Sequence, residues 1–387
     1  MRGVMKMVHA INEKSIKGAA KTKQLVIDSD VHSYLNSLND LVPYCDESLQ
    51  KRLNIGKFKK QAFEGKLISA AEFRFPECRY INPVSVVRGD AFSPEGAIPG
   101  SDPAFVAKDL FDRSNTQYGI LNSCNATMGA FHNIDIANGF NTAFNDWQYE
   151  NWIEKDSRYK MSMLVSPLDP AAAVKEIERV GKKPGVVAVN LQTTTTPFGN
   201  RNLYPIYEAA EHYGLQMLIH PDSEASGENG PAQAVGPAST YMEWHTCLGF
   251  NAQRNIVSLV CEGVFEKFPK LKFVFVEYGV AGIVPLLWRI DKNWKTLREE
   301  VPWLKELPSE YIKRNVRLGT QPIEEPYRPK DLLEIIQMAG IEDMLLYCSD
   351  YPHWDGDEAD RVFNTFPKEL KNKIFYENAL NTYHFTR

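Results

Sequence analysis

From residue 100 onward, short apolar runs rich in β-branched residues alternate with longer stretches whose apolar residues recur at helical spacing. The short runs have the length and composition of buried strands, and the stretches between them are typical of amphipathic helices. With an apolar run near residue 25, eight strands are predicted: Leu25–Ile27, Tyr118–Asn122, Met161–Val165, Val186–Leu191, Gln216–His220, Lys272–Tyr278, Val316–Gly319 and Met344–Cys348. The predicted helices end in glycines that we expect in the left-handed conformation, and they include Ala171–Gly181, Tyr204–Gly214 and Asp331–Gly340.

Eight alternating strand and helix units predict an α/β fold, a parallel (β/α)8 TIM barrel rather than an open sheet. We expect residues 25–387 to form a single barrel domain. A long insertion, at about residues 36–101, follows the first strand and contains a basic helical stretch, Ser48–Phe63. Loops after the strands cover the active face of a barrel, so we interpret the insertion as a lid or a dimerisation segment, with a plain surface excursion as the alternative. Residues 1–24 are expected to form an arm, either poorly ordered or in contact with another subunit.

Charge and composition argue against several classes of function. With a net charge of −5, the chain lacks the excess of positive charge that is typical of nucleic-acid-binding proteins. No apolar run reaches the roughly 18 residues that a membrane span needs. Scattered lysines without an apolar core near the N-terminus argue against a secretory signal. The six cysteines lie far apart and form no Cys-x-x-Cys pair, so we expect reduced core thiols and a cytoplasmic protein.

The first predicted strand ends in a polar sequence, Asp28-Ser-Asp30-Val-His32. A strand alternates its faces with a period of two, so Asp28, Asp30 and His32 are expected to point the same way. Two carboxylates and an imidazole at the end of an apolar strand are costly to bury unless a cation neutralises them, which favours a divalent metal. The alternative is an Asx turn that closes the strand and leaves His32 half exposed.

Later strand ends carry further ionisable residues. His220 ends the fifth predicted strand, Glu277 lies near the end of the sixth, and Asp350 follows the eighth. Active-site groups of α/β barrels lie at the carboxyl ends of the strands, so these side chains are expected to meet the Asp-x-His sequence of the first strand. Two imidazoles and two carboxylates suit Zn²⁺, Mn²⁺ or Fe²⁺ better than Ca²⁺.

These motifs resemble those of the amidohydrolase superfamily, in its amidohydrolase-2 branch. That branch is typified by aminocarboxymuconate-semialdehyde decarboxylase and by enzymes similar to γ-resorcylate decarboxylase. The resemblance runs from residue 25 to near the C-terminus. The matching segments are Asp30-Val-His32, His220-Pro221, Gly263-Val-Phe-Glu-Lys-Phe-Pro-Lys-Leu-Lys-Phe273, Arg289-Ile-Asp291, Ser349-Asp-Tyr-Pro-His353 and Glu377-Asn-Ala379.

The resemblance implies four metal ligands, which are Asp30, His32, His220 and Asp350. Asp30 stands where the family often has His or Glu, and Asp28 is expected behind the ligands, orienting one of them or capping the strand. The family's decarboxylases typically carry a histidine on strand six, where this chain has Glu277. An ionised glutamate accepts protons or hydrogen bonds, but it cannot act as a cationic electrophile.

Other residues are candidates for the substrate pocket. A replacement for the missing imidazole comes from His245 or His353, unless His245 is a surface residue at a helix start and His353 faces away from the pocket. Arg74, in the insertion, could pair with a substrate carboxylate, although an ion pair with a neighbouring glutamate is its more ordinary role. Trp354 is a candidate wall of an aromatic pocket, whereas Trp288 is expected to pack in the core.

The resemblance implies a metal-dependent non-oxidative decarboxylase, a carbon–carbon lyase, that acts on an aromatic or vinylogous carboxylic acid. Asp350 or His245 would then deliver the proton, and Glu277 would orient the substrate or hold a water. The alternative is a metal-dependent hydrolase of an amide, lactone or carbon–carbon bond that uses a metal-activated water, with Asp350 carrying the proton. A barrel reused as a binding protein is a third possibility, and the retained set of ligand-type residues argues against it.

These hypotheses make shared demands on cofactors and partners. We expect one divalent metal ion, Zn²⁺ first and Mn²⁺ or Fe²⁺ as alternatives, and no organic cofactor. The expected partner is a small-molecule carboxylic acid, ester or amide, with neither nucleic acid nor membrane involved. By resemblance to the branch, the protein is expected to form a homodimer or a higher homo-oligomer.

Overall fold

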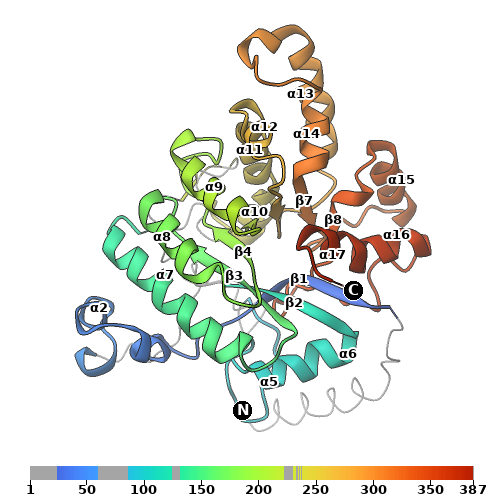
Figure 1. Ribbon diagram of the computed structural model, residues 1–387. Coiled ribbons are helices and arrows are strands. Elements are labelled where there is room, and N and C mark those ends of the chain that lie inside the picture. The colour runs from blue at the N-terminus through green and yellow to red at the C-terminus, as the bar shows by residue number, and fades with distance from the viewer. Residues whose placement is uncertain are drawn as a thin grey trace.

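Eight parallel strands run in chain order around a barrel, each hydrogen-bonded to the next (Figure 1). The computed structural model describes residues 24–59, 86–123, 131–221, 230–231, 234, 236 and 238–386. The strands are buried on both faces, which is why each one reads as an apolar run. Their bounds are β1 Val26–His32, β2 Thr116–Asn122, β3 Tyr159–Val165, β4 Val186–Leu191, β5 Gln216–Ile219, β6 Phe273–Phe275, β7 Val316–Gly319 and β8 Leu345–Leu346.

The barrel closes between β8 and β1 through single bonds rather than a full ladder. Val31 and Tyr351 form an isolated parallel bridge, and the amide of His32 donates to the carbonyl of Tyr351 at 2.8 Å. Lower in the same seam, the amide of Ser29 donates to the carbonyl of Tyr347 at 2.9 Å. The predicted (β/α)8 TIM barrel with a long insertion after its first strand is therefore confirmed.

Helices connect the strands and cover the outside of the barrel, with α7, α8 and α9 along one side and α15 and α16 along the other (Figure 1). The α-helices are α2 Glu47–Leu53, α5 Pro103–Val106, α6 Asp112–Ser114, α7 Ile134–Gln148, α8 Pro170–Val180, α9 Tyr204–His212, α10 Tyr241–Thr246, α11 Leu248–Cys261, α12 Val264–Lys267, α13 Ile283–Leu297, α14 Pro308–Asn315, α15 Pro329–Ala339, α16 Lys368–Asn372 and α17 Asn378–Thr382. Shorter 3-10 or π segments are η1 Leu38–Tyr44, η2 Gly56–Phe58, η3 Ala107–Phe111, η5 Tyr149–Ile153, η6 Arg201–Leu203, η7 Arg298–Glu300, η8 Glu342–Met344 and η9 Lys373–Glu377.

The apolar core has two parts. The larger cluster joins strands and helices around the barrel, and the smaller one contains Ile27, Ile120, Leu218 and Val274 together with residues of α17. Strands from opposite sides of the barrel contribute to the smaller cluster, so it fills the barrel interior and α17 closes one end. The polar site described below lies at the other end, where the strands finish.

The predicted elements agree with the structure to within a few residues, and the differences have local causes. β1 continues to His32 instead of ending at Ile27, and β6 stops at Phe275 because the chain turns to a φ of +64° at Glu277. Gly340 ends α15 with a φ of +62°, the left-handed conformation that was predicted. The same prediction was wrong for Gly181, whose φ is −61°.

Several predictions concern residues outside the described ones. They are the N-terminal arm up to Lys23, the central part of the insertion with Arg74, and two of the six cysteines, Cys78 and Cys124. The four described cysteines are free, as expected. Within the described part of the chain, no helix has both the length and the apolar character of a membrane span.

Candidate metal centre

The ionisable residues at the strand ends converge on one side of the barrel. Asp30 and His32 lie on β1, and His220 immediately follows β5. Glu277 follows β6 and Asp350 follows β8, with φ angles of +64° and +57°. The left-handed conformation costs a non-glycine residue on the order of 1 kcal/mol and turns the chain sharply just after each strand. All of these side chains are buried, as barrel geometry predicted.

Five of these side chains form what we call the carboxylate–imidazole ring: His32, Asp350, His353, Glu277 and His220. Oδ1 of Asp350 lies 2.7 Å from Nε2 of His32 and 2.7 Å from Nδ1 of His353. Nδ1 of His353 lies 3.6 Å from Oε1 of Glu277, whose Oε2 lies 2.9 Å from Nε2 of His220. The rings of His220 and His32, with centroids 5.0 Å apart, complete the circle.

Members of this ring, together with Asp30, form groups of donors that fit a divalent cation. Asp30, His32 and His220 offer ligand atoms within 4.8 Å of one another, and His32, Asp350 and His353 form a second such group. Oδ2 of Asp30 and Oδ2 of Asp350 are buried and make no hydrogen bond with the described residues. A buried carboxylate oxygen without a partner is costly, and a cation relieves that cost. The predicted four ligands are thus split over two groups that share His32.

The protein environment shifts the pKa values of the two carboxylates in the carboxylate–imidazole ring, Asp350 and Glu277, in opposite directions. Burial raises the pKa of Asp350 well above its usual range, with Glu277 adding repulsion and His353 opposing the rise. Burial also opposes ionisation of Glu277, but the attraction and hydrogen bonds of His220 and His353 outweigh it and hold the Glu277 pKa well below normal. A divalent ion bound nearby favours the ionised form of both carboxylates.

Asp28 lies behind the ring, where its carboxylate ties β1 to the loop after β8. Its Oδ1 accepts the amide of Asp30 at 3.2 Å and the amide of Ser349 at 2.9 Å. Burial raises the Asp28 pKa to about 7. These bonds fix the backbone on either side of two proposed ligands, Asp30 and Asp350, which fits the supporting role expected for Asp28.

Comparison with known proteins places this architecture in a family. The family model Amidohydro_2, described as amidohydrolase, matches residues 27–385. The chain belongs to the amidohydrolase family. This amidohydrolase is 24% identical, over 294 residues that span 72% of the chain and 86% of its relative, to a gamma-resorcylate decarboxylase of Polaromonas sp..

Solved structures share the fold of this amidohydrolase. An amidohydrolase from Mycobacterium avium subsp. paratuberculosis superposes with a TM-score of 0.66 at 21% identity, covering 93% of this chain and 99% of that one. A 5-carboxyvanillate decarboxylase from Novosphingobium aromaticivorans, complexed with manganese and 4-hydroxy-3-methoxy-5-nitrobenzoic acid, superposes with a TM-score of 0.63 at 17% identity, covering 94% and 96%.

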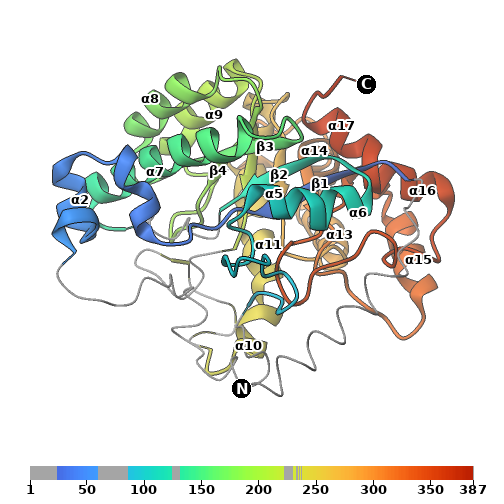
Figure 2. The ribbon, with the colours of Figure 1, turned by 90° about the horizontal axis from the view of Figure 1, so that it is seen from below.

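The remaining candidate residues of this amidohydrolase lie outside the ring. His245, in the last turn of α10, has its Nε2 3.4 Å from Oδ2 of Asp355, so it is neither at a helix start nor in the ring. The Trp354 side chain is 50% exposed next to His353 in sequence, and its backbone amide donates to the carbonyl of Val86 at 2.9 Å. Figure 2 shows α10 and residues 86–101 on the same side of the barrel.

The prediction for Trp288 was wrong, because this side chain is 53% exposed on α13. Helical periodicity places a residue on a face, but it does not say whether a neighbouring element covers that position.

Two asparagines that support the candidate metal site were missed by sequence reasoning. The side-chain amide of Asn122, at the end of β2, donates to Oδ1 of Asp30 at 3.1 Å. The side-chain amide of Asn190, on β4, donates in turn to Oδ1 of Asn122. The available signal was a polar residue near the end of each apolar strand.

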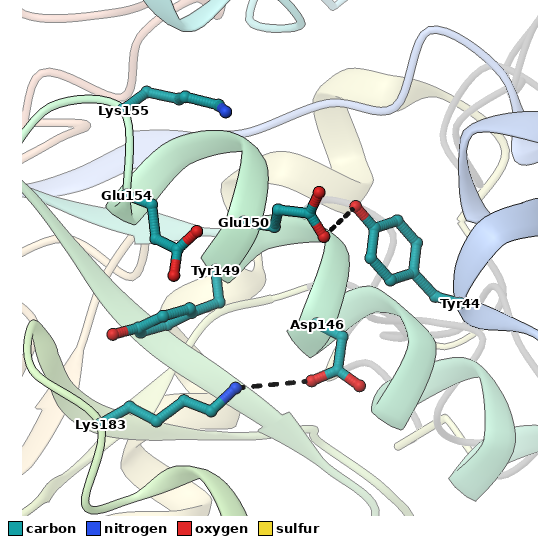
Figure 3. A pocket seen from close by; sticks show the side chains of 7 residues that line it. All are labelled: Tyr44, Asp146, Tyr149, Glu150, Glu154, Lys155 and Lys183. Carbon is teal, nitrogen blue, oxygen red and sulfur yellow. Dashed lines mark hydrogen bonds and ion pairs between the residues drawn. The ribbon is translucent and has the colours of Figure 1, made fainter.

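A separate cavity of about 670 Å³ is lined by residues of η1, α7 and η5 and of the segments after η5 and α8 (Figure 3). Two pairs of its polar groups contact one another: Tyr44 Oη donates to Glu150 at 2.9 Å, and Nζ of Lys183 lies 3.8 Å from Asp146. No residue of the carboxylate–imidazole ring lines it. The lining residues are Tyr44, Asp146, Tyr149, Glu150, Glu154, Lys155 and Lys183. We therefore place the candidate site at the strand ends.

Proposed function

We propose that this amidohydrolase is a metal-dependent, non-oxidative decarboxylase of an aromatic or vinylogous carboxylic acid. The observation that supports it most is the arrangement of the carboxylate–imidazole ring. The metal donors Asp30, His32 and His220 lie next to a hydrogen-bonded carboxylate and imidazole, Asp350 and His353. The names of related proteins support the reaction class, because they are decarboxylases of resorcylate, carboxyvanillate and dihydroxybenzoate.

Asp30, His32, His220 and Asp350 would hold the metal ion. When bound, the ion supplies Lewis-acid charge that holds and polarises the carboxylate or a neighbouring hydroxyl of the substrate. Zinc is the ion expected from the donor set, and manganese is the ion named for two of the solved relatives. Elemental analysis of the purified protein, compared with His220→Ala and Asp350→Asn, tests the site. Equal metal content in all three proteins would contradict it.

The chain's own residues would move the proton that replaces the carboxylate. Asp350 transfers a proton to the substrate carbon that bears the carboxylate. The bond from this carbon to the carboxylate then breaks, its electron pair returns to the substrate's π system, and CO₂ leaves. Solvent then returns a proton to Asp350. Glu277, held between His220 and His353, orients the substrate through its ionised oxygens. His245 is the alternative proton donor, with Asp355 beside it.

A hydrolase is the second candidate function, and Glu277 is the observation that favours it. A buried carboxylate whose pKa is held well below normal is suited to orienting a water or accepting a hydrogen bond. Incubation of metal-loaded protein with hydroxybenzoates, and separately with lactones and amides, separates the two functions. Release of CO₂ from an acid supports the decarboxylase. Turnover of a lactone or amide, with no CO₂ from any acid tested, would replace it with the hydrolase.

Variants distinguish the two proposed proton donors. We expect Asp350→Asn to abolish CO₂ release, and His245→Asn to lower it only if the proton comes through His245. His212→Asn is a matched control, because His212 ends α9 and its ring packs on Tyr213. Full activity of Asp350→Asn in metal-saturated protein would remove Asp350 from the mechanism.

The pocket and the assembly complete the proposal. His353 and Trp354 would contact the substrate from the loop after β8, and Arg74 from the insertion would pair with its carboxylate. We also propose one barrel domain over residues 25–387 and a homodimer, with residues 1–24 as an arm. Light scattering of the purified protein measures the assembly, and a monomeric mass at micromolar concentration would contradict the dimer.

A further inference from the structure

Both ring nitrogens of His353 have close partners on different parts of the chain. Nδ1 faces two carboxylates, 2.7 Å from Oδ1 of Asp350 and 3.6 Å from Oε1 of Glu277. Nε2 lies 2.8 Å from the hydroxyl of Tyr34, a buried residue between the end of β1 and the insertion. The imidazole also stacks on His32, with centroids 4.3 Å apart and an interplanar angle of 27°. The orientation of the His353 imidazole is therefore constrained on three sides.

These partners determine which nitrogen carries the hydrogen. In metal-loaded protein the cation favours the ionised form of both carboxylates, and ionised carboxylate oxygens accept hydrogen bonds and cannot donate, so Nδ1 carries the hydrogen that faces Asp350 and Glu277. In the neutral imidazole Nε2 is then an acceptor, and the Tyr34 hydroxyl donates to it. A phenylalanine at position 34 would leave Nε2 without this donor while keeping the aromatic packing.

The insertion also holds the backbone of the loop that carries His353. Val87 and His353 form an antiparallel bridge, and the amide of Arg88 donates to the carbonyl of Pro352 at 2.8 Å. The amide of Tyr34 donates to the carbonyl of Gly100 at 2.8 Å. Gly100 has a φ of +77°, and a Cβ there would lie 2.9 Å from Cδ2 of Tyr34, so a side chain at this position would displace the phenol.

We propose that Tyr34, whose amide is bound by Gly100 of the insertion, is a positioning residue that holds His353 in the Nδ1–H tautomer with its N–H directed at Asp350. Asp350 is one of the proposed metal ligands, and a hydrogen bond to a ligating carboxylate fixes its orientation. The described part of the insertion then supports the site, through its contacts with Tyr34 and with the loop that carries His353. The catalytic consequence rests on the proposed function, whereas the tautomer and the metal affinity do not.

Tyr34→Phe tests this proposal, with Tyr44→Phe as a matched control. Tyr44 lies in the insertion, and its hydroxyl donates to Glu150 at 2.9 Å, outside the carboxylate–imidazole ring. The first readout is the tautomer of His353 in zinc-loaded protein, from imidazole ¹⁵N–¹H correlation spectra. The chain has eight histidines, and the spectrum of His353→Asn assigns the signal. The second readout is metal affinity, from competition with a chelator.

We expect the Nδ1–H tautomer in the wild type and in Tyr44→Phe, and a mixture of tautomers in Tyr34→Phe. Metal affinity should fall about tenfold in Tyr34→Phe only, the lower end of the effect for groups that orient metal ligands. An Nε2–H tautomer in the wild type, or an unchanged tautomer and affinity in Tyr34→Phe, would overturn the proposal. If both readouts behave as expected but no acid releases CO₂, the decarboxylase proposal fails and the role of Tyr34 stands.

Discussion

The metal proposal predicts that Asp350→Asn loses about half of the stability that metal binding adds to the wild type. In metal-free protein, Asp350 is a buried carboxyl whose pKa is raised by burial and whose Oδ2 has no hydrogen bond with the described residues. A neutral amide carries no charge to bury. The amide keeps a polar atom at the Oδ2 position but removes the cost of burying a charge, so the metal-free variant should be at least as stable as the wild type.

Added metal should stabilise the wild type more than the variant. A ligand at 100 times its Kd stabilises the folded state by about 2.7 kcal/mol. Unfolding entropy of about 2.1 cal/mol/K per residue gives roughly 0.8 kcal/mol/K for this chain of 387 residues, so the wild-type Tm should rise by about 3 °C. Loss of one ligand that weakens binding tenfold removes about 1.4 kcal/mol, which is half of this gain.

Differential scanning calorimetry measures both halves of the prediction, on chelator-treated protein and again after addition of zinc or manganese. Asp343→Asn is the matched control, because the side chain of Asp343 is 76% exposed and pairs with Lys373 on the surface. It should leave the metal-dependent rise in Tm unchanged. An Asp350→Asn variant that gains as much Tm as the wild type on metal addition, or that melts clearly below it when metal-free, would refute the role of Asp350 as a ligand.

Three further predictions each concern a single side chain. Asn122→Ala removes the donor to Oδ1 of Asp30, so chelator competition should show about tenfold weaker metal binding, and unchanged affinity would contradict this. Glu277→Gln removes the charge beside His220, so kcat in metal-saturated protein should fall about a hundredfold or more, and an unchanged kcat would exclude Glu277 from catalysis. Burial raises the Asp357 pKa from 3.8 to about 7, so the folded state binds a proton that the unfolded state has lost, and stability falls as the pH rises through this range. Asp357→Asn should therefore match the wild type near pH 4 and exceed it by up to about 4 kcal/mol at pH 8 in urea unfolding, and an equal difference at both pH values would contradict the assignment.

The sequence alone was sufficient for the barrel and for its order of strands. Parallel strands covered on both faces appear as uninterrupted apolar runs, so β4 and β7 were predicted with the bounds that the structure has. β6 was predicted too long, because the turn at Glu277 depends on its backbone conformation and not on hydrophobicity.

Much of the site was also predictable from the sequence. The carboxyl ends of parallel strands meet at one end of a barrel, so Asp30, His32, His220 and Asp350 were expected near one another. The structure brings these buried side chains to the predicted end of the barrel, although the ligand atoms fall into two overlapping groups. Barrel topology predicts which strand ends meet, but the rotamers and backbone turns that set the distances between atoms depend on packing.

What only the tertiary structure decided are the pairings within the site. His353 meets Tyr34 across 319 sequence positions, and His32 meets Asp350 across 318. Nothing in the local pattern around Tyr34 distinguishes it from any other tyrosine in a loop. Hydrophobic periodicity reflects neighbours within a few residues, and so it specifies strands and helices. A hydrogen bond between two loops exists only once the whole barrel has closed and brought them together.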